Sequence, residues 1–361
     1  MAAQQHTEQK HIVVVGAGYA GLPAANGIGR RHRVTLIAPE THFLHRVRQH
    51  ETAAGRPGHR RPIARVVRGR KVTHRRARVT GLDLNARKVF LDDGGAVSYD
   101  TLVYALGSRT AFHGVPGAAE HGYPAERAAE LRQRIAEATA PGTIAVVGGG
   151  ATGIEMAAEL AEAHPGWQVE LVTADRVGGW FSERGRSHVL TALDRLGVRV
   201  REHTEVTAVT ADGLRTADGP VPADLVVWAA SMEPHPLAAE AGLAVGPDGR
   251  ALVDDRLRSL SHPDVHVIGD AAAVDVPGVG RLRMACATAL PMGRYTGRLL
   301  GGRTTKPFAF RYAAQCLSLG RGDGMLQLIH GDDSMRPTVL TGFAGRLAKA
   351  AIVNGVVAGL R

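Results

Sequence analysis

The sequence predicts a mixed α/β protein with two parallel-sheet domains of the same design, and three observations carry this prediction. A glycine-rich segment, Gly16–Gly21, directly follows the apolar run His11–Val15. A second one, Gly148–Gly153, directly follows the apolar run Ile144–Val147. Each segment opens a helical pattern, so both are typical of the turn between the strand and the helix of a βαβ unit. The third observation is the distribution of charge along the chain.

Charge divides the 361 residues into three parts. Residues 1–112 carry 19 Lys and Arg against 7 Asp and Glu, residues 113–245 carry 10 against 18, and residues 246–361 carry 15 against 9. Because the acidic middle differs from both basic flanks, we expect the flanks to belong together. The expected domains are a discontinuous first domain, an inserted second domain and a C-terminal hairpin and helix, at residues 1–112 with 246–305, 113–245 and 306–361.

The first part of the chain has a βαβ unit followed by a small antiparallel meander and a strand that ends in glycine. The turn signal at Asp92–Gly95 separates the strands of the meander. The expected elements in order are a strand at 12–15, a helix at 19–29, a strand at 34–38, a hairpin at 89–99 and a strand at 99–107.

The middle part repeats this order of elements, which indicates an internal duplication of architecture. Its expected elements are a helix at 126–138, a strand at 144–147, a helix at 153–163, a strand at 169–173, a helix at 187–196, a strand at 198–200 and, after another meander, a strand at 223–230. The remaining elements are a strand at 265–270 that ends in Gly-Asp, a helix at 283–300, a hairpin at 315–329 and a weakly amphipathic helix at 345–360.

The spacing of the glycines indicates two dinucleotide sites. In such a turn the first glycine lets the chain bend off the strand, the second lets the backbone approach a pyrophosphate, and the third lets the helix pack on the strand. The helix N-terminus then points free N–H groups at the phosphates. Two dinucleotides in one chain indicate that one nucleotide reduces the other.

These motifs together resemble the two-dinucleotide-binding flavoproteins of the pyridine nucleotide-disulfide oxidoreductase superfamily. Within it, the chain is most similar to the branch of type II NADH dehydrogenases and ferroptosis-suppressor-like NAD(P)H:quinone reductases. The resemblance runs from about residue 10 to about residue 330 and implies two Rossmann-like domains. It implies FAD at the first site and NADH or NADPH, as co-substrate, at the second. The strand ending at Asp270 would close the FAD site, with its carboxylate on the ribitol.

The candidate cofactor residues follow from the motifs and the resemblance. For FAD they are Gly16, Gly18, Gly21, Glu40, Arg48, Val79, Ala105, Gly107, Gly269, Asp270 and Pro291. For NAD(P)H they are Gly148, Gly150, Thr152, Gly153, Thr173 and Arg176. No metal ligands are expected.

In such units an acidic residue at the end of the second strand binds the ribose of the nucleotide, and this acidic residue is missing in both units. Ala38 occupies its place in the first unit, and Glu40 stands in for it two residues later. In the second unit Thr173 ends the strand, and an acid there would repel the 2′-phosphate of NADPH. Arg176 either accepts that phosphate or is a surface residue, so NADH and NADPH both stay open.

Glu155 is the candidate catalytic residue. It lies two residues after Gly153, and the resemblance places such a glutamate facing the flavin and the nicotinamide. Desolvation there is expected to raise its pKa and to help proton transfer to a reduced acceptor. Arg46, Arg48 and His50 follow the first unit, where the resemblance implies a segment beside the FAD. Either one arginine pairs with the pyrophosphate or both arginines face solvent.

The expected activity is hydride transfer from NAD(P)H to FAD, followed by transfer of two electrons to a quinone or quinone-like acceptor. The absence of glutamines near Ala287 and Pro291 departs from the family pattern and leaves the acceptor open. A reductase of an electron-carrier protein and an NADH-sensing protein with little turnover are the alternatives. Cys286 is either a small apolar filler or a reactive thiol, and Cys316 is expected in the core.

Partners and location are less sharply defined by the sequence. The stretch Arg56–Arg78 holds ten Lys and Arg and no acid, which fits an anionic membrane surface, an acidic protein or a plain solvated face. Nucleic acid is not expected, and a homodimer stays open. There is no apolar run of eighteen residues, and the polar start Met1–Lys10 has no signal-peptide core. We expect a cytoplasmic protein, with peripheral membrane contact as an open alternative.

Overall fold

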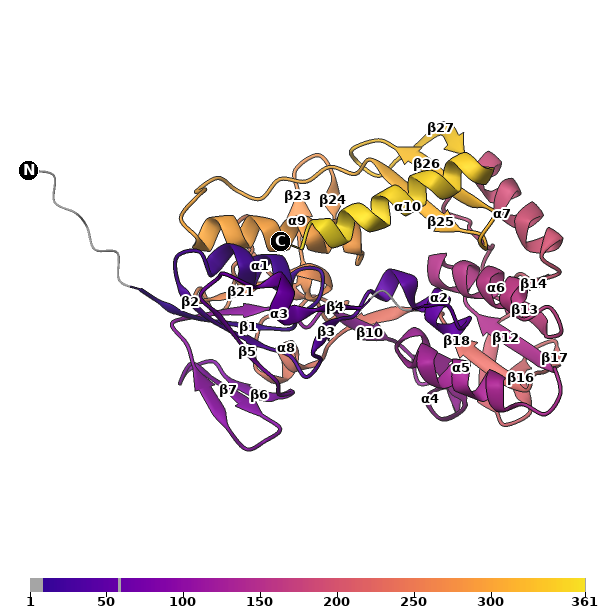
Figure 1. The fold of residues 1–361 in the computed structure, drawn as a ribbon, viewed down its shortest axis with the longest axis horizontal. Helices are drawn as coiled ribbons and strands as arrows, with labels where there is room; N and C mark the ends of the chain where they lie inside the picture. Colours follow the sequence, from indigo (N-terminus) through magenta and orange to yellow (C-terminus); the bar gives the residue numbers. More distant parts are fainter. Residues whose placement is uncertain (1–8, 58–59, 361) are drawn as a thin grey trace, which may run out of the picture.

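The computed structural model describes residues 9–57 and 60–360. Residues 1–8 of the polar start, residues 58–59 of the basic stretch and Arg361 lie outside the described residues. Figure 1 shows an elongated molecule with two lobes side by side, and C-terminal elements that run along one side of both. Each lobe contains one parallel sheet.

The first lobe is built on a five-stranded parallel sheet with the strand order β21-β9-β1-β2-β5. Its strands are His11–Val15 (β1), Arg33–Ile37 (β2), Val72–Arg75 (β5), Thr101–Tyr104 (β9) and Val265–Val267 (β21). The strand β21 comes from a part of the chain more than one hundred residues after the others, so this lobe is discontinuous in sequence. Strand β5 was not predicted, because its arginine and histidine hide the apolar pattern of an edge strand.

The second lobe repeats that sheet with the order β11-β18-β12-β13-β14. Its strands are Gly122–Pro124 (β11), Thr143–Val147 (β12), Gln168–Val172 (β13), Arg199–Arg201 (β14) and Leu225–Trp228 (β18). Both sheets are parallel throughout and place the strand before the glycine turn at the centre. The predicted α/β fold with two Rossmann-like domains is therefore confirmed.

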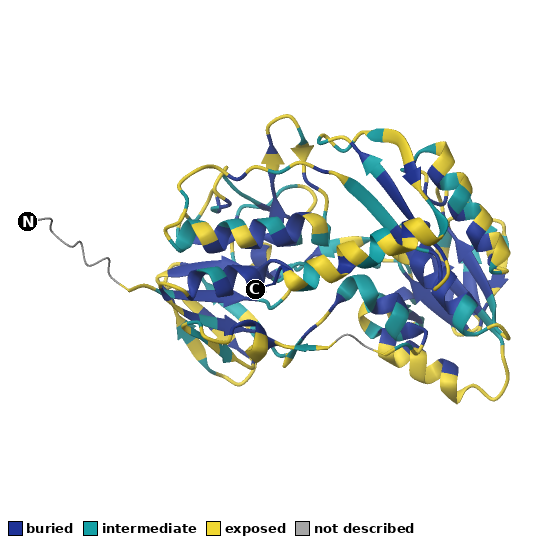
Figure 2. Ribbon diagram, turned by 45° about the horizontal axis from the view of Figure 1, so that its top comes forward, coloured by how far each residue is buried: buried dark blue, intermediate teal, exposed yellow. Residues whose placement is uncertain are grey.

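Helices cover the sheets because their strands are apolar on both faces, as parallel strands require. In the first lobe Gly21–Ile28 (α1) packs against Cys286–Leu300 (α9). A Cβ added to Gly27 would lie 2.7 Å from the Cα of Gly297, so only glycine allows the helices to come this close. The second lobe has Ala128–Glu137 (α5), Ala151–Ala163 (α6) and Glu183–Arg195 (α7). Figure 2 shows buried strands with mostly exposed outer helix faces.

Each lobe carries an antiparallel meander, as predicted. The first consists of Val79–Asp83 (β6), Lys88–Leu91 (β7) and Ala96–Ser98 (β8). The second consists of Val206–Thr210 (β15), Gly213–Thr216 (β16) and Gly219–Pro222 (β17). Between the lobes, Ser108–Thr110 (β10) pairs with Met232–Pro234 (β19), so the two connecting segments run antiparallel to each other.

The C-terminal part is a three-stranded antiparallel sheet and a helix. The predicted hairpin is formed by Ala314–Ser318 (β25) and Gly324–Ile329 (β26), and a third strand, Met335–Leu340 (β27), was not predicted. The helix Gly342–Ala358 (α10) packs on β26, and β25 packs on α6 of the second lobe. The C-terminal end of α10 reaches the first lobe, where the backbone carbonyl of Val357 accepts from Arg61.

Shorter elements complete the chain. They are His42–Phe43 (β3), the 3-10 helix Arg46–Arg48 (η1), Gln49–Ala53 (α2), Arg61–Pro62 (β4), Ile63–Val66 (α3), Ala118–His121 (α4), Ala125–Arg127 (η2), Leu237–Glu240 (α8), Ala251–Leu252 (β20), Gly269–Ala271 (η3), Ala272–Ala273 (β22), Asp275–Val276 (β23) and Gly280–Arg281 (β24). Within the described residues, no helix is both long enough and apolar enough to cross a bilayer.

Candidate functional site

The two glycine turns have the same geometry. The first glycine of each, Gly16 and Gly148, has a positive φ of 101° and 118°. Its N–H donates to the last residue of the neighbouring strand, at 2.9 Å to the Ile37 oxygen and 2.8 Å to the Val172 oxygen. A Cβ at either glycine would overlap a backbone carbonyl, that of Ala105 or that of Ala229. The predicted duplication is thus preserved at the level of single hydrogen bonds.

The second and third glycines of each turn have different roles. A Cβ on Gly21 would overlap the carbonyl of Gly16, and one on Gly153 would overlap the carbonyl of Gly148. A Cβ on Gly18 or on Gly150 would meet nothing within 4 Å. The third glycine of each turn is therefore required for packing, whereas the second faces open space at the helix N-terminus. That space is where a pyrophosphate fits.

A cavity opens beside the first turn. Eight of the predicted FAD residues line it: Gly16, Gly18, Glu40, Val79, Ala105, Gly107, Gly269 and Asp270. They come from the carboxyl ends of parallel strands and from the meander, which is the position of ligand sites in open α/β sheets. Gly21 lies behind the turn.

Asp270 provides the test of whether a cofactor fits this cavity. Its Oδ2 accepts from the Ser108 hydroxyl at 2.7 Å, whereas its Oδ1 is buried with no hydrogen-bond partner among the described residues. Burial raises the pKa of this carboxyl. A buried acceptor without a partner is costly unless a ligand supplies the donor. The hydroxyl groups of a ribitol chain are such donors, so the residues present fit FAD.

Besides Gly21, two more predicted FAD residues lie outside this cavity. Arg48 donates to Glu51 at 3.3 Å and to the Asn354 Oδ1 at 3.2 Å, which places it beside α10. Pro291 lies in the second turn of α9, and its neighbour Ala289 lines the cavity instead.

Arg46 is the arginine that the structure brings to the cavity. It lines the cavity, donates to the Ser108 carbonyl, and pairs with Glu126 at 2.6 Å. The sequence placed both arginines in one short segment, and the 3-10 turn η1 decides which of them faces the cavity.

The second turn has three further predicted residues around it. Thr152 is exposed in the first turn of α6. Thr173 is buried after β13, and its hydroxyl accepts from the Asp175 N–H at 3.3 Å. Arg176 is exposed and pairs with Glu183 at 3.3 Å. The guanidinium is therefore at the surface but already has a carboxylate partner.

Glu155 lies in a buried cluster of charges from three parts of the chain. Its Oε1 accepts from the Lys349 Nζ at 2.7 Å and from the Ser318 N–H at 2.9 Å. Its Oε2 lies 3.6 Å from the Nδ1 of His50. The side chains of Glu155, Lys349 and His50 are 8%, 14% and 4% exposed. Helices α6, α10 and α2, which are far apart in the sequence, thus meet at one carboxylate.

The expected rise in the pKa of Glu155 is wrong. Burial alone would raise this pKa, but Lys349, His50 and the Ser318 N–H lower it below its usual value. Glu155 in turn raises the pKa of Lys349. Burial lowers the pKa of His50. At neutral pH the cluster therefore holds a carboxylate, an ammonium and a neutral imidazole.

Lys349 is the site residue that sequence reasoning missed. In a weakly amphipathic helix at 345–360 a lysine is expected on the polar, solvent-facing side. Its spacing to Val353 and Val356 is four and seven residues, which places it on the buried face of α10. That spacing was the available signal.

A second cavity borders this cluster. It has a volume of about 190 Å³ and lies between α2, the β25–β26 hairpin and α10. It is lined by Val47, Arg48, His50, Glu51, Ser318, Gly320, Arg321, Asp323, Arg346, Lys349, Ala350 and Val353. Two members of the Glu155 cluster therefore face a space that a small molecule can enter.

Cys286 is the first residue of α9. Burial raises the pKa of its thiol to about 11. It is therefore a neutral thiol at pH 7, as expected for an apolar filler. Burial also raises the pKa of Cys316 on β25.

Comparisons with known proteins agree with this geometry. Residues 10–293 match the family "Pyridine nucleotide-disulphide oxidoreductase". An NADH dehydrogenase-like protein of Mycobacterium tuberculosis is 32% identical, over 79% of this chain and 78% of its own length. A type II NADH:quinone oxidoreductase of Staphylococcus saprophyticus is 27% identical, over 90% and 91%. The structure of NDH2 from Plasmodium falciparum in complex with NADH superimposes with a TM-score of 0.82 at 14% identity, over 97% and 95% of the two chains.

Proposed function

Since the chain belongs to the pyridine nucleotide-disulphide oxidoreductase family, we propose that it is an FAD-dependent NAD(P)H dehydrogenase with a quinone-like acceptor. The observation that supports the acceptor is the cavity beside the Glu155 cluster. The type II NADH:quinone oxidoreductase of Staphylococcus saprophyticus is similar over nine-tenths of the chain. We assign residues 1–112 and 246–305 to the FAD domain, and residues 113–245 to the NAD(P)H domain.

The chain's own residues would hold the cofactor at the first turn. The backbone around Gly18 would bind the pyrophosphate, and the free Oδ1 of Asp270 would accept from a ribitol hydroxyl. Arg46 would neutralise phosphate charge at the cavity edge. Bound FAD supplies two-electron transfer between a nicotinamide and an acceptor.

Around the second turn, Gly150 would leave room for the pyrophosphate of NAD(P)H. No acid stands at the end of β13, so the 2′-phosphate of NADPH meets no carboxylate at Thr173. Binding of that phosphate by Arg176 would require the guanidinium to leave Glu183. We therefore propose that NADH and NADPH both serve, with NADH preferred.

Reduction of a quinone requires protons as well as electrons. Lys349 holds a proton at Nζ within hydrogen-bond distance of Glu155 and lines the acceptor cavity. Because Glu155 raises its pKa, Lys349 would keep this proton and donate a hydrogen bond to an acceptor oxygen, whose own protonation would come from solvent. Glu155 would hold the ammonium in place.

The C-terminal helix also offers a route to a membrane-dissolved acceptor. Leu340, Phe343, Leu347 and Ile352 of β27 and α10 are 41%, 62%, 51% and 42% exposed. Phe343 and Leu347 lie four residues apart and so share one face of α10, and exposed apolar side chains of this kind fit contact with a lipid surface. We propose that α10 rests on a membrane at its interface, next to the acceptor cavity.

An acceptor panel tests the proposed function. The FAD-loaded protein is mixed with NADH or NADPH, and oxidation is followed with menadione, with an acidic iron–sulfur protein and without acceptor. Steady oxidation with menadione supports a quinone-type acceptor. Turnover only with the acidic protein, with a steep loss of rate in salt, would instead identify a carrier reductase. A single reduction without turnover would identify a sensor.

A further inference from the structure

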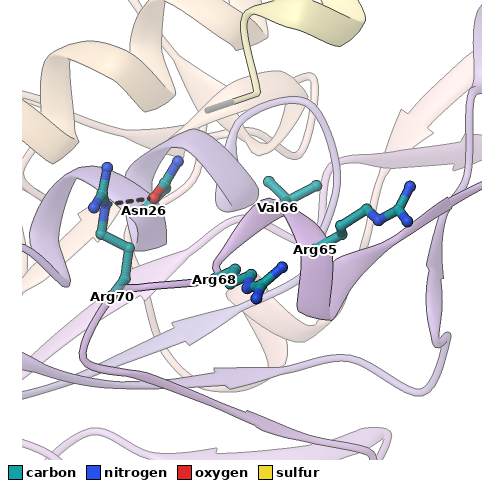
Figure 3. A pocket seen from close by; sticks show the side chains of 5 residues that line it. All are labelled: Asn26, Arg65, Val66, Arg68 and Arg70. Carbon is teal, nitrogen blue, oxygen red and sulfur yellow. Dashed lines mark hydrogen bonds between the residues drawn. The ribbon is translucent and has the colours of Figure 1, made fainter.

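A second feature of the first lobe lies apart from the two dinucleotide turns. It is a cavity of about 540 Å³ lined by Asn26, Arg65, Val66, Arg68 and Arg70. Figure 3 shows the three arginines on α3 and on the segment after it, with Asn26 on α1 facing Arg70. We call Arg65, Arg68 and Arg70 the arginine triad. It belongs to the basic stretch Arg56–Arg78, and the proposed electron transfer gives no role to this excess of positive charge.

The triad has no carboxylate partner among the residues that the structure describes. No ion pair forms there on Arg65 or Arg68, and both side chains are exposed. Arg70 donates its Nε to the Asn26 Oδ1 at 2.9 Å and its Nη1 to the Gly69 carbonyl at 3.3 Å, both uncharged groups.

Several arginines elsewhere in the protein have a carboxylate partner. Arg195 lies 2.7 Å from Asp323, and Arg250 lies 2.6 Å from Asp248. Even Arg56, at the start of the same basic stretch, contacts Glu159 at 3.0 Å. The three arginines of the triad differ from these in having no acid beside them among the described residues.

The segments that carry the triad and its basic neighbours also lack acids in their sequence. Three segments that are distant in sequence, 23–38, 56–78 and 294–306, contain no Asp or Glu. They meet here because α1 packs against α9. Their proximity is seen at Arg303, whose pKa is lowered by burial and by the charges of Arg30, Arg298 and Arg70. Like charges brought together in this way repel one another and attract an anion.

We propose that this cavity binds a phosphate-bearing anion through the arginine triad. Guanidinium forks match phosphate oxygens in pairs, and three forks around one concave space suit a group with three or more oxygens. The phosphate belongs either to a soluble ion or metabolite or to the headgroup of an anionic lipid. The site lies outside the FAD cavity, so the proposal does not depend on the electron acceptor.

Asn26 orients the site. Its side chain is 3% exposed and is held between two partners, because its Nδ2 donates to the Leu360 carbonyl at 3.5 Å. Its Oδ1 fixes the guanidinium of Arg70 at Nε and leaves the Nη2 edge available. An arginine held in this way loses less side-chain freedom when an anion arrives.

The test compares two double variants of the FAD-loaded protein. Arg65→Gln/Arg68→Gln removes two exposed guanidinium groups of the triad. Arg132→Gln/Arg134→Gln removes two exposed guanidinium groups from α5 in the other lobe, so it is matched for charge. Binding is measured at low ionic strength by calorimetry with inorganic phosphate and pyrophosphate, and by co-sedimentation with phosphatidylglycerol vesicles against phosphatidylcholine vesicles.

We expect the wild type and the α5 variant to bind at least one anionic probe, and the triad variant to bind it at least about tenfold more weakly. Selective loss with the soluble anions identifies a soluble ligand, and selective loss with the vesicles identifies a lipid headgroup. The proposal is overturned when the wild type binds no probe, when the triad variant binds as the wild type does, or when both variants lose affinity equally. Unchanged unfolding curves confirm that either variant is folded.

Discussion

The substitution Lys349→Met removes the positive charge that pairs with buried Glu155, and its effect on the free energy of unfolding can be worked out from the structure. The substitution keeps the length of the side chain but leaves Glu155 with only His50 and the Ser318 N–H. Removing one partner of a buried ion pair costs about 3–5 kcal/mol, because the other charge stays buried. Since the side chains of Lys349 and Glu155 are only 14% and 8% exposed, most of that cost applies here. We expect the free energy of unfolding to fall by about 3 kcal/mol at pH 7.

The loss of stability in Lys349→Met should also depend on pH in a definite direction. In the wild type the pKa of Glu155 is lowered, so its contribution to stability is present above its unfolded pKa and is lost as the pH falls. In Lys349→Met burial dominates and the pKa is raised instead. The folded variant then binds a proton more readily than the unfolded chain, so its stability deficit shrinks as the pH falls from 8 to 5.

Chemical denaturation across this pH range is the assay. Glu155→Gln/Lys349→Met, which removes both charges, should recover most of the loss, because no charge then stays unpaired. Arg346→Met is the control: it removes an exposed cation from the same helix and should cost at most about 1 kcal/mol. A deficit that is independent of pH and is not recovered in the double variant would refute the reasoning.

Three other predictions concern the sites. The Cβ of Gly150→Val meets no protein atom within 4 Å, so this variant should retain FAD but should not be reduced by NAD(P)H. Gly18→Val should fail to retain FAD. Absorbance spectra before and after addition of NADH test both outcomes. Arg176→Ala should lower kcat/KM for NADPH more than for NADH, and an equal change for both would place this residue outside the site. Cys286, whose pKa is raised to about 11, should react with iodoacetamide at pH 7 about 100-fold more slowly than a free thiol, as followed by mass spectrometry of the modified peptide.

The parts of the fold that could be predicted depend on local requirements. The positive φ of Gly16 and the close packing of Gly21 allow no other residue, so the glycines alone predict the turn. The same holds for the second turn. The strand β5 was missed because an edge strand with exposed arginines lacks an apolar pattern.

The parts that could not be predicted depend on contacts between distant segments. The pKa of Glu155 is set by Lys349, which lies 194 residues away in the chain. Likewise, Arg46 and Arg48 differ only in the direction that one turn of η1 gives them. The absence of acids around the arginine triad becomes visible only when the three acid-free segments are seen together.

Anaerobic titration of the FAD-loaded protein with NADH, followed by menadione, tests most directly whether two nucleotides meet between the duplicated turns. We expect NADH to bleach the visible absorbance of the bound flavin in the wild type but not in Gly150→Val, and menadione to restore it. A flavin that keeps its colour in the wild type, or that is bleached equally in both proteins, would contradict this assignment.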